Sequence, residues 1–146
     1  MSSACPDLDD LLCFAIHSTA HAIQRAQKPI LDKLGLTYPQ YLVMLLLWAR
    51  DGRTVGALGE KLFLESSTLT PLLKRLETAG LVQRARDAAD ERQVRVTLTE
   101  EGRQLYAKAR SLPGWWERTP ITRPEEVEAL REGVLRLRDS LAPKRD

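Results

Sequence analysis

Cys13 carries the side chain best suited to covalent chemistry in this sequence. The chain has two cysteines, and the other, Cys5, lies eight residues upstream. The thiolate is the reactive form of cysteine, and hydrogen-bond donors, positive charge or a helix N-terminus stabilise it. His17 lies one helical turn after Cys13, so a protonated imidazole there would favour the thiolate. The alternative is that Cys13 is an inert, buried small hydrophobe, which is the commoner fate of an intracellular cysteine.

A second group of side chains suits contact with nucleic acid. Short hydroxyl side chains bind base edges and phosphates at close range, the Thr methyl suits the thymine methyl, and Lys and Arg bind phosphate. The predicted DNA-contacting residues of this group are Ser66, Ser67, Thr68, Thr70, Pro71, Lys74, Arg75, Arg84, Arg86 and Arg92. Each arginine taken singly also fits a solvated face, so the prediction depends on the order of elements that carries them.

The apolar pattern places Cys13 in an amphipathic helix over about residues 7–35. Apolar residues recur there at i, i+3 and i+4, and Asp7 is the expected N-cap. Cys13 would then lie about six residues past the cap, where the helix dipole contributes little. Tyrosine hydroxyls that donate hydrogen bonds to the sulfur would therefore stabilise the thiolate more than the helix dipole does.

The next three elements are predicted to be helices. A Thr37–Gln40 capping box opens an apolar helix that ends near Gly52. A short helix is expected from about Thr54 to Leu62. A further helix begins with an N-cap at Ser66 or Ser67, and Gly80 lies where a glycine terminates helices. Its inward stripe is expected to consist of Leu69, Leu72, Leu73 and Leu76.

Two strands joined by a charged tip follow these helices. Residues 81–86 form one predicted strand, and the alternation over residues 93–98 indicates a second, half-buried one. This order predicts a mainly α fold with a small β-hairpin, namely a winged helix-turn-helix over about residues 54–98. In such a module the second helix of the turn enters the major groove, and the hairpin tip reaches the backbone or the minor groove.

The C-terminal segment predicts a dimer contact. Prolines break the chain before residue 124, and Trp115 and Trp116 in this connector suit either a dimer interface or plain packing. The helix over about residues 123–142 carries a stripe spaced by three and four residues, consisting of Val127, Leu130, Val134, Leu137 and Leu141. The stripe could pack on the chain's own core, but its position favours a partner subunit, together with the helix over residues 7–35.

Composition bounds these expectations. The 146 residues suit a single domain over 1–146, and a formal net charge of +2 excludes a histone-like polycation. The polar N-terminus, the apolar runs far shorter than a membrane span and the two cysteines favour a cytoplasmic protein without a membrane partner. His17 and His21 have the i, i+4 spacing of metal ligands, but no further ligand motif accompanies them, so no metal or other cofactor is expected.

The helix-turn-helix and wing resemble the MarR family of dimeric transcriptional regulators. The residues that carry the resemblance are 64–76, Gly80-Leu81-Val82, Asp90-Glu91-Arg92 and Leu98-Thr99-Glu100-Glu101-Gly102. The resemblance implies a homodimer on a pseudo-palindromic double-stranded DNA operator. It also implies that Arg92 enters the minor groove and that Asp90 orients it through a charge-assisted bond.

A narrower resemblance is to the organic hydroperoxide sensors of the OhrR type. It is carried by Leu12-Cys13-Phe14-Ala15 and by Leu36-Thr37-Tyr38-Pro39-Gln40-Tyr41-Leu42. The resemblance implies that Cys13 reacts with the peroxide and that Tyr38 hydrogen-bonds its sulfur from the other subunit. His17 and Gln27 stand where many such proteins carry tyrosines, and either can donate a hydrogen bond. The predicted sensor pocket therefore comprises Tyr38, Tyr41, His17, Gln27 and Phe14.

The resemblance predicts a one-cysteine sensor, because no cysteine follows Cys13. A small external thiol would then complete the switch by condensing with the oxidised sulfur, or Cys5 would act as the resolving thiol. Three other functions compete. They are a MarR-type repressor that binds a small phenolic or apolar ligand with Cys13 incidental, a thiol peroxidase and a structural adaptor. The sequence offers no catalytic constellation for an enzyme, and an adaptor leaves the hydroxyl-rich helix unexplained.

Overall fold

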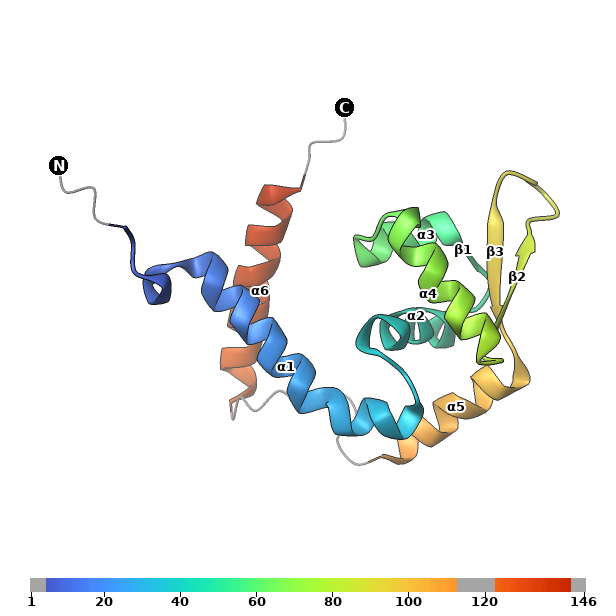
Figure 1. Cartoon of the computed structure of the whole chain (residues 1–146), viewed down its shortest axis with the longest axis horizontal. Helices are drawn as coiled ribbons and strands as arrows, with labels where there is room; N and C mark the ends of the chain where they lie inside the picture. The colour runs from blue at the N-terminus through green and yellow to red at the C-terminus, as the bar shows by residue number, and fades with distance from the viewer. Residues whose placement is uncertain (1–4, 113–122, 143–146) are drawn as a thin grey trace. The chain divides into compact units, whose positions relative to one another are not determined.

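The computed structural model describes residues 5–112 and 123–142 and confirms the predicted fold class (Figure 1). The chain divides into two compact units, residues 1–116 and residues 117–146. The described elements are the 3-10 helix η1 (Leu8–Asp10), the helices α1 (Leu12–Leu34), α2 (Tyr38–Ala49), α3 (Val55–Leu62), α4 (Ser66–Thr78), α5 (Glu100–Ser111) and α6 (Pro124–Leu141), and the strands β1 (Arg53–Thr54), β2 (Val82–Arg86) and β3 (Val94–Leu98).

The start of α1 differs from the expectation in a way that matters for Cys13. Asp7 caps the short helix η1 rather than α1, with its carboxylate accepting from the Asp9 N–H at 3.1 Å. Leu11 is extended, with φ −86° and ψ 116°, and α1 begins only after it. The predicted cap was therefore wrong, and Cys13 is the second residue of α1. The N–H groups in this first turn have no partner within the helix, which makes it the positive end of the dipole.

The helix-turn-helix forms as the apolar pattern predicts. The Thr37–Gln40 capping box opens α2, and the Thr54 hydroxyl caps α3 by accepting from the Ala57 N–H at 3.1 Å. The turn after α3 is tight, because a Cβ on Gly59 would lie 2.7 Å from the Leu64 carbonyl oxygen. The predicted leucine stripe of α4 is buried against α2, α3 and β2. Gly80, with φ +77°, ends α4 as expected.

The N-cap predicted for α4 was wrong. Ser66 and Ser67 lie inside its first turn, and the cap position belongs to Glu65, which makes no side-chain capping hydrogen bond. The serine hydroxyls consequently remain on the exposed surface of the helix.

The sheet has the strand order β1-β3-β2 and is antiparallel throughout. The hairpin of β2 and β3 pairs Val82 with Leu98 and Arg86 with Val94, so the wing is in register over five residues on each strand. Strand β1 was not expected, since two residues carry no periodicity, and Arg53 pairs with Val96. The apolar residues Val82 and Val96 anchor the hairpin to the core, while its tip extends beside α4 (Figure 1).

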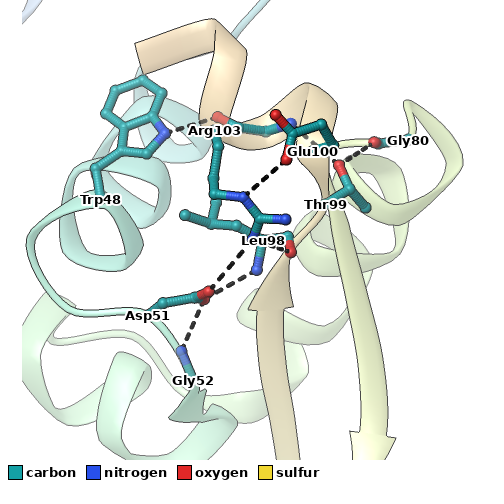
Figure 2. Close-up of polar contacts among 9 residues, drawn as sticks. Trp48, Asp51, Gly52, Gly80, Leu98, Thr99, Glu100 and Arg103 are labelled. Carbon is teal, nitrogen blue, oxygen red and sulfur yellow. Dashed lines mark hydrogen bonds and ion pairs between the residues drawn. The ribbon is translucent and has the colours of Figure 1, made fainter. Parts of the chain in front are cut away.

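The hairpin returns to the helices at a close-packed joint, which we call the wing–α5 junction and define as Trp48, Asp51, Thr99, Gly102 and Arg103. The indole of Trp48 donates to the Gly102 carbonyl at 2.9 Å, and Figure 2 shows this indole beside the start of α5. The Thr99 hydroxyl accepts from the Gly102 N–H at 3.0 Å and donates to a backbone carbonyl after α4 at 2.6 Å. Asp51 accepts from the last N–H of β3 at 2.9 Å, and Arg103 lies 4.0 Å from the other Asp51 oxygen.

The unit that contains α6 is a single amphipathic helix over its described residues. The expected stripe lies along it, and Leu130, Val134 and Leu141 expose 54%, 41% and 74% of their surface. Its role in dimerisation stays a prediction, and Trp115 and Trp116 lie outside the described residues. Over residues 5–112 and 123–142, no helix combines the length and the apolar character that crossing a membrane requires.

We expect Gly102→Ala to destabilise the protein by about 1–3 kcal/mol, the typical cost of overpacking. The new Cβ would lie 2.2 Å from the Leu81 carbonyl oxygen, so the backbone would have to move. Urea unfolding followed by circular dichroism measures the change. Gly56→Ala is the matched control, because nothing lies within 4 Å of its Cβ position in α3, and it should be neutral or stabilising. Equal stability of the two variants would contradict the role given to this contact.

Candidate DNA-binding surface and sensor cysteine

The outer face of α4 presents the residues that the sequence pattern selects. Burial of the four leucines on the inner face leaves seven predicted residues exposed, which are Ser66, Ser67, Thr68, Thr70, Pro71, Lys74 and Arg75. Hydroxyl and basic groups are thus grouped on the helix that follows the tight turn. This is the geometry that a helix needs to lie in a major groove.

The wing tip holds Arg92 outward on a carboxylate. The Arg92 side chain is 89% exposed, and its Nε and Nη2 donate to the two oxygens of Asp90 at 3.1 and 3.3 Å. These side-chain bonds, and then the Arg92 backbone N–H, lower the pKa of Asp90. Arg86 steadies the same loop by donating to the Glu91 carbonyl at 2.8 Å. The pairing of Asp90 with Arg92 that the family resemblance implies is confirmed.

The base of the wing tip depends on Asp87, which the sequence analysis did not single out. Asp87 accepts from the Ala89 N–H at 2.8 Å and from Arg95, and these two donors, in that order, lower the pKa of the carboxyl group. Arg95 also donates to the Gly52 carbonyl, so one guanidinium joins the wing to the turn before β1. The signal that could have indicated this pair is its position in the sequence, since Asp87 directly follows β2 and Arg95 lies in β3.

Arg84 differs from the other predicted DNA-contacting residues. It is only 22% exposed, and its Nη2 lies 3.2 Å from Glu77 Oε1 while its backbone N–H donates to Oε2 at 2.9 Å. The backbone bond and then the side-chain bond lower the pKa of Glu77. Arg84 therefore ties β2 to the end of α4, and contact with DNA remains only a prediction for this residue.

Cys13 is exposed at the start of α1, with Phe14 half-buried beside it. One turn further along α1, the His17 ring packs on His21 with centroids 4.7 Å apart. Over the described residues, no group of three or more His, Cys, Asp or Glu side chains could hold a metal ion. The thiol thus stands at a helix N-terminus that small molecules can reach.

The tyrosines predicted for the sensor pocket lie elsewhere in the same chain. Tyr38 and Tyr41 have ring centroids 6.3 Å apart at the start of α2, and burial is the main cause that raises the pKa of Tyr41. The buried Gln27 Oε1 has no hydrogen-bond partner in the described part of the chain. Gln27 is 14 residues beyond Cys13, about 21 Å along α1 at 1.5 Å per residue. The residues of the predicted pocket therefore do not come together within one chain, because Cys13 and Gln27 lie far apart along α1.

Comparisons with known proteins agree with this architecture. The family model for the transcriptional regulators SarA/Rot matches residues 25–109. The organic hydroperoxide resistance transcriptional regulator of Bacillus subtilis (strain 168) is 42% identical over 137 residues, covering 94% of this chain and 93% of that protein. The HTH-type transcriptional regulator TtmR of Methylorubrum extorquens (strain PA1) is 48% identical over 134 residues, covering 92% and 69%.

This chain belongs to the MarR family of transcriptional regulators. Among solved structures, reduced AbfR bound to DNA matches with a TM-score of 0.75 and 34% identity over 92% of this chain and 94% of that one. AbfR is from Staphylococcus epidermidis, and its disulfide form matches with a TM-score of 0.64 and 35% identity over 89% and 91%. As a member of the MarR family the protein is a DNA-binding transcriptional regulator and not an enzyme.

We expect Lys74→Ala to weaken binding to all DNA sequences alike if Lys74 contacts phosphate. The slope of log affinity against log salt should fall by about one for each lost contact in each half-site. Fluorescence anisotropy at several salt concentrations measures both quantities. Lys108→Ala removes an exposed charge from α5 and should leave the slope unchanged. An unchanged slope in Lys74→Ala would remove Lys74 from the predicted contact set.

We expect Glu77→Gln to lower stability at pH 7 and to lose this effect in acid. Because the folded state lowers the pKa of Glu77 from 4.5, the carboxylate stabilises the fold above that value, and the stabilisation is lost as pH falls through the folded pKa. Urea unfolding of both proteins at pH 7 and at a pH far enough below 4.5 to protonate Glu77 in the folded state tests this. Glu101→Gln, an exposed change on α5, controls for net charge. A stability gap that persists in acid would contradict the assignment.

Proposed function

We propose that this protein is a homodimeric repressor that senses organic hydroperoxides by oxidation of Cys13 and then releases its operator. The observation that carries the proposal is the position of Cys13, exposed in the first turn of α1, in a chain 42% identical to an organic hydroperoxide resistance regulator. The backbone N–H groups of this first turn have no partner within the helix, so they are available to a polar reactant that approaches Cys13.

The proposed reaction is a two-electron oxidation of sulfur. The Cys13 thiolate attacks the terminal peroxide oxygen, an S–O bond forms, the O–O bond breaks, and the alkoxide leaves and takes up a proton to become the alcohol. The sulfenic acid then condenses with a small thiol, which yields a mixed disulfide and releases water. Cys5 is exposed and lies outside the helices, so it is the internal alternative to the small thiol.

A second copy of the chain would complete the sensor. Cys13 lies at one end of α1, while Tyr38, Tyr41 and Gln27 lie towards its other end, so one chain does not assemble the predicted pocket. In the proposed dimer, Tyr38 of one copy meets Cys13 of the other, as the OhrR-type resemblance implies. The exposed stripe of α6 supports the same arrangement, because apolar helix faces of this spacing pack on partner helices.

Operator release would follow from a change in dimer geometry. An adduct on Cys13 at a packed interface cannot be accommodated unless helices move. The two α4 helices must lie about one DNA turn apart, roughly 34–36 Å, to enter successive major grooves. A shift away from that spacing lowers operator affinity, so the switch is a difference in binding free energy between two dimer conformations.

We expect an organic hydroperoxide plus a small thiol to abolish operator binding by the wild type and to leave Cys13→Ser bound. Electrophoretic mobility shift at fixed salt measures this, with cumene hydroperoxide as the probe. Cys5→Ser is the matched control, and release by that variant when the small thiol is left out would exclude Cys5 as the resolving thiol. If wild type and Cys13→Ser both keep binding, the hydroperoxide proposal is wrong and a small-molecule effector becomes the better explanation.

A further inference from the structure

A groove beside Tyr38 carries a positive charge that the proposed function does not use. It has a volume of about 330 Å³ and lies between α1 and the start of α2. His21, Arg25, Lys28 and Asp32 of α1 line one side, and Tyr38 lies on the other. The groove is open to solvent, so a flexible molecule can enter it along its length.

Arg25 is the unneutralised charge in this groove. Lys28 Nζ lies 2.9 and 3.0 Å from the two oxygens of Asp32, so these two side chains compensate each other. Over residues 5–112 and 123–142, the Arg25 guanidinium has no hydrogen bond or ion pair. A guanidinium presents several donors in one plane and binds a carboxylate in bidentate fashion. The groove therefore suits an anionic ligand rather than a neutral one.

Two of the residues that line the groove, His21 and Lys28, lie on the side of α1 that carries Cys13, while Arg25 lies about 120° around the helix from it. With 3.6 residues per turn, Cys13, His17, His21 and Lys28 lie on one side of the helix, and His21 both lines the groove and packs on His17. Arg25 is 12 residues beyond Cys13, about 18 Å along the axis. In the proposed dimer, Tyr38 places the same groove beside the Cys13 of the other copy. Within one chain the distance along α1 is too long for direct contact, so in the proposed dimer the groove adjoins the Cys13 thiol of the other copy.

We propose that Arg25 binds a carboxylate on the molecule that reacts with Cys13. This inference rests on the proposed function and names a recognition element within it. Two reactants can carry the carboxylate, a fatty-acid hydroperoxide in the oxidation step and a small acidic thiol in the condensation step. The recognition chemistry is the same for both, namely a charge-assisted bond that holds the reactant while its peroxide or thiol group reaches the sulfur.

The first arm of the test compares two peroxides that differ only in charge. We measure the rate of Cys13 thiol loss with linoleic acid hydroperoxide and with its methyl ester, below their aggregation concentrations and at fixed salt. We expect the wild type to react roughly fivefold faster with the acid, a ratio in keeping with an exposed ion pair. Arg25→Gln should lose this ratio, and Lys33→Gln, an exposed change elsewhere on α1, should retain it.

The second arm compares two thiols in the same way. The sulfenic acid form is mixed with 3-mercaptopropionic acid or its methyl ester, and mass spectrometry follows the mixed disulfide in wild type, Arg25→Gln and Lys33→Gln. An Arg25-dependent preference in the first arm identifies the peroxide as the source of the carboxylate, and one in the second identifies the thiol. Equal rates for acid and ester in both arms, or a preference that survives Arg25→Gln, would overturn the inference.

The same experiment separates this inference from the proposed function. Loss of the Cys13 thiol with either peroxide supports the function whatever its dependence on Arg25. If neither peroxide oxidises Cys13, the proposed function fails and the inference fails with it. Operator binding by each variant, measured before oxidation, shows that the substituted proteins are folded.

Discussion

The winged helix-turn-helix depends on the close approach of Gly102 to the Leu81 carbonyl. No side chain fits between α5 and the strand entry at this point, and the Trp48 indole fixes the same residue by donating to its carbonyl (Figure 2). Because Thr99 and Asp51 bind the adjacent backbone, hydrogen bonds join the wing, α2 and α5 where they meet. A hairpin of five-residue strands has little stability alone, so its orientation comes from this junction.

Charge pairing organises the wing without making it strongly basic. Asp87 and Asp90 accept from arginines and from backbone N–H groups, and their pKa values are lowered as a result. These carboxylates therefore stay ionised and hold the loop in shape while Arg92 remains exposed. The low net charge of the sequence fits this design, since acidic residues position the basic ones instead of merely diluting them. The net charge of the sequence would therefore underestimate the local positive charge of such a surface.

The sequence predicted those features that periodicity or local chemistry controls. The leucine stripe of α4, the Thr37 capping box and the β2–β3 hairpin follow from spacing and from turn residues. The N-caps predicted for α1 and α4 were wrong for one reason. A residue type that suits a cap can instead cap a neighbouring short helix, as Asp7 does, or make no cap at all, as with Ser66 and Ser67. The Glu77–Arg84 pair joins elements through tertiary packing, which no local pattern encodes. The separation of Cys13 from Tyr38 likewise depends on the length and direction of α1.

The uncapped start of α4 has a consequence for the free protein. Glu65 offers no side-chain acceptor to the first N–H groups of the helix, and the hydroxyls of Ser66 and Ser67 stay on the surface instead of folding back onto the backbone. The first N–H groups of α4 are therefore left without a side-chain acceptor. A serine or aspartate cap would stabilise the fold but occupy the same donors. The start of α4 thus forgoes the stabilisation that a capping side chain typically adds, about 1 kcal/mol.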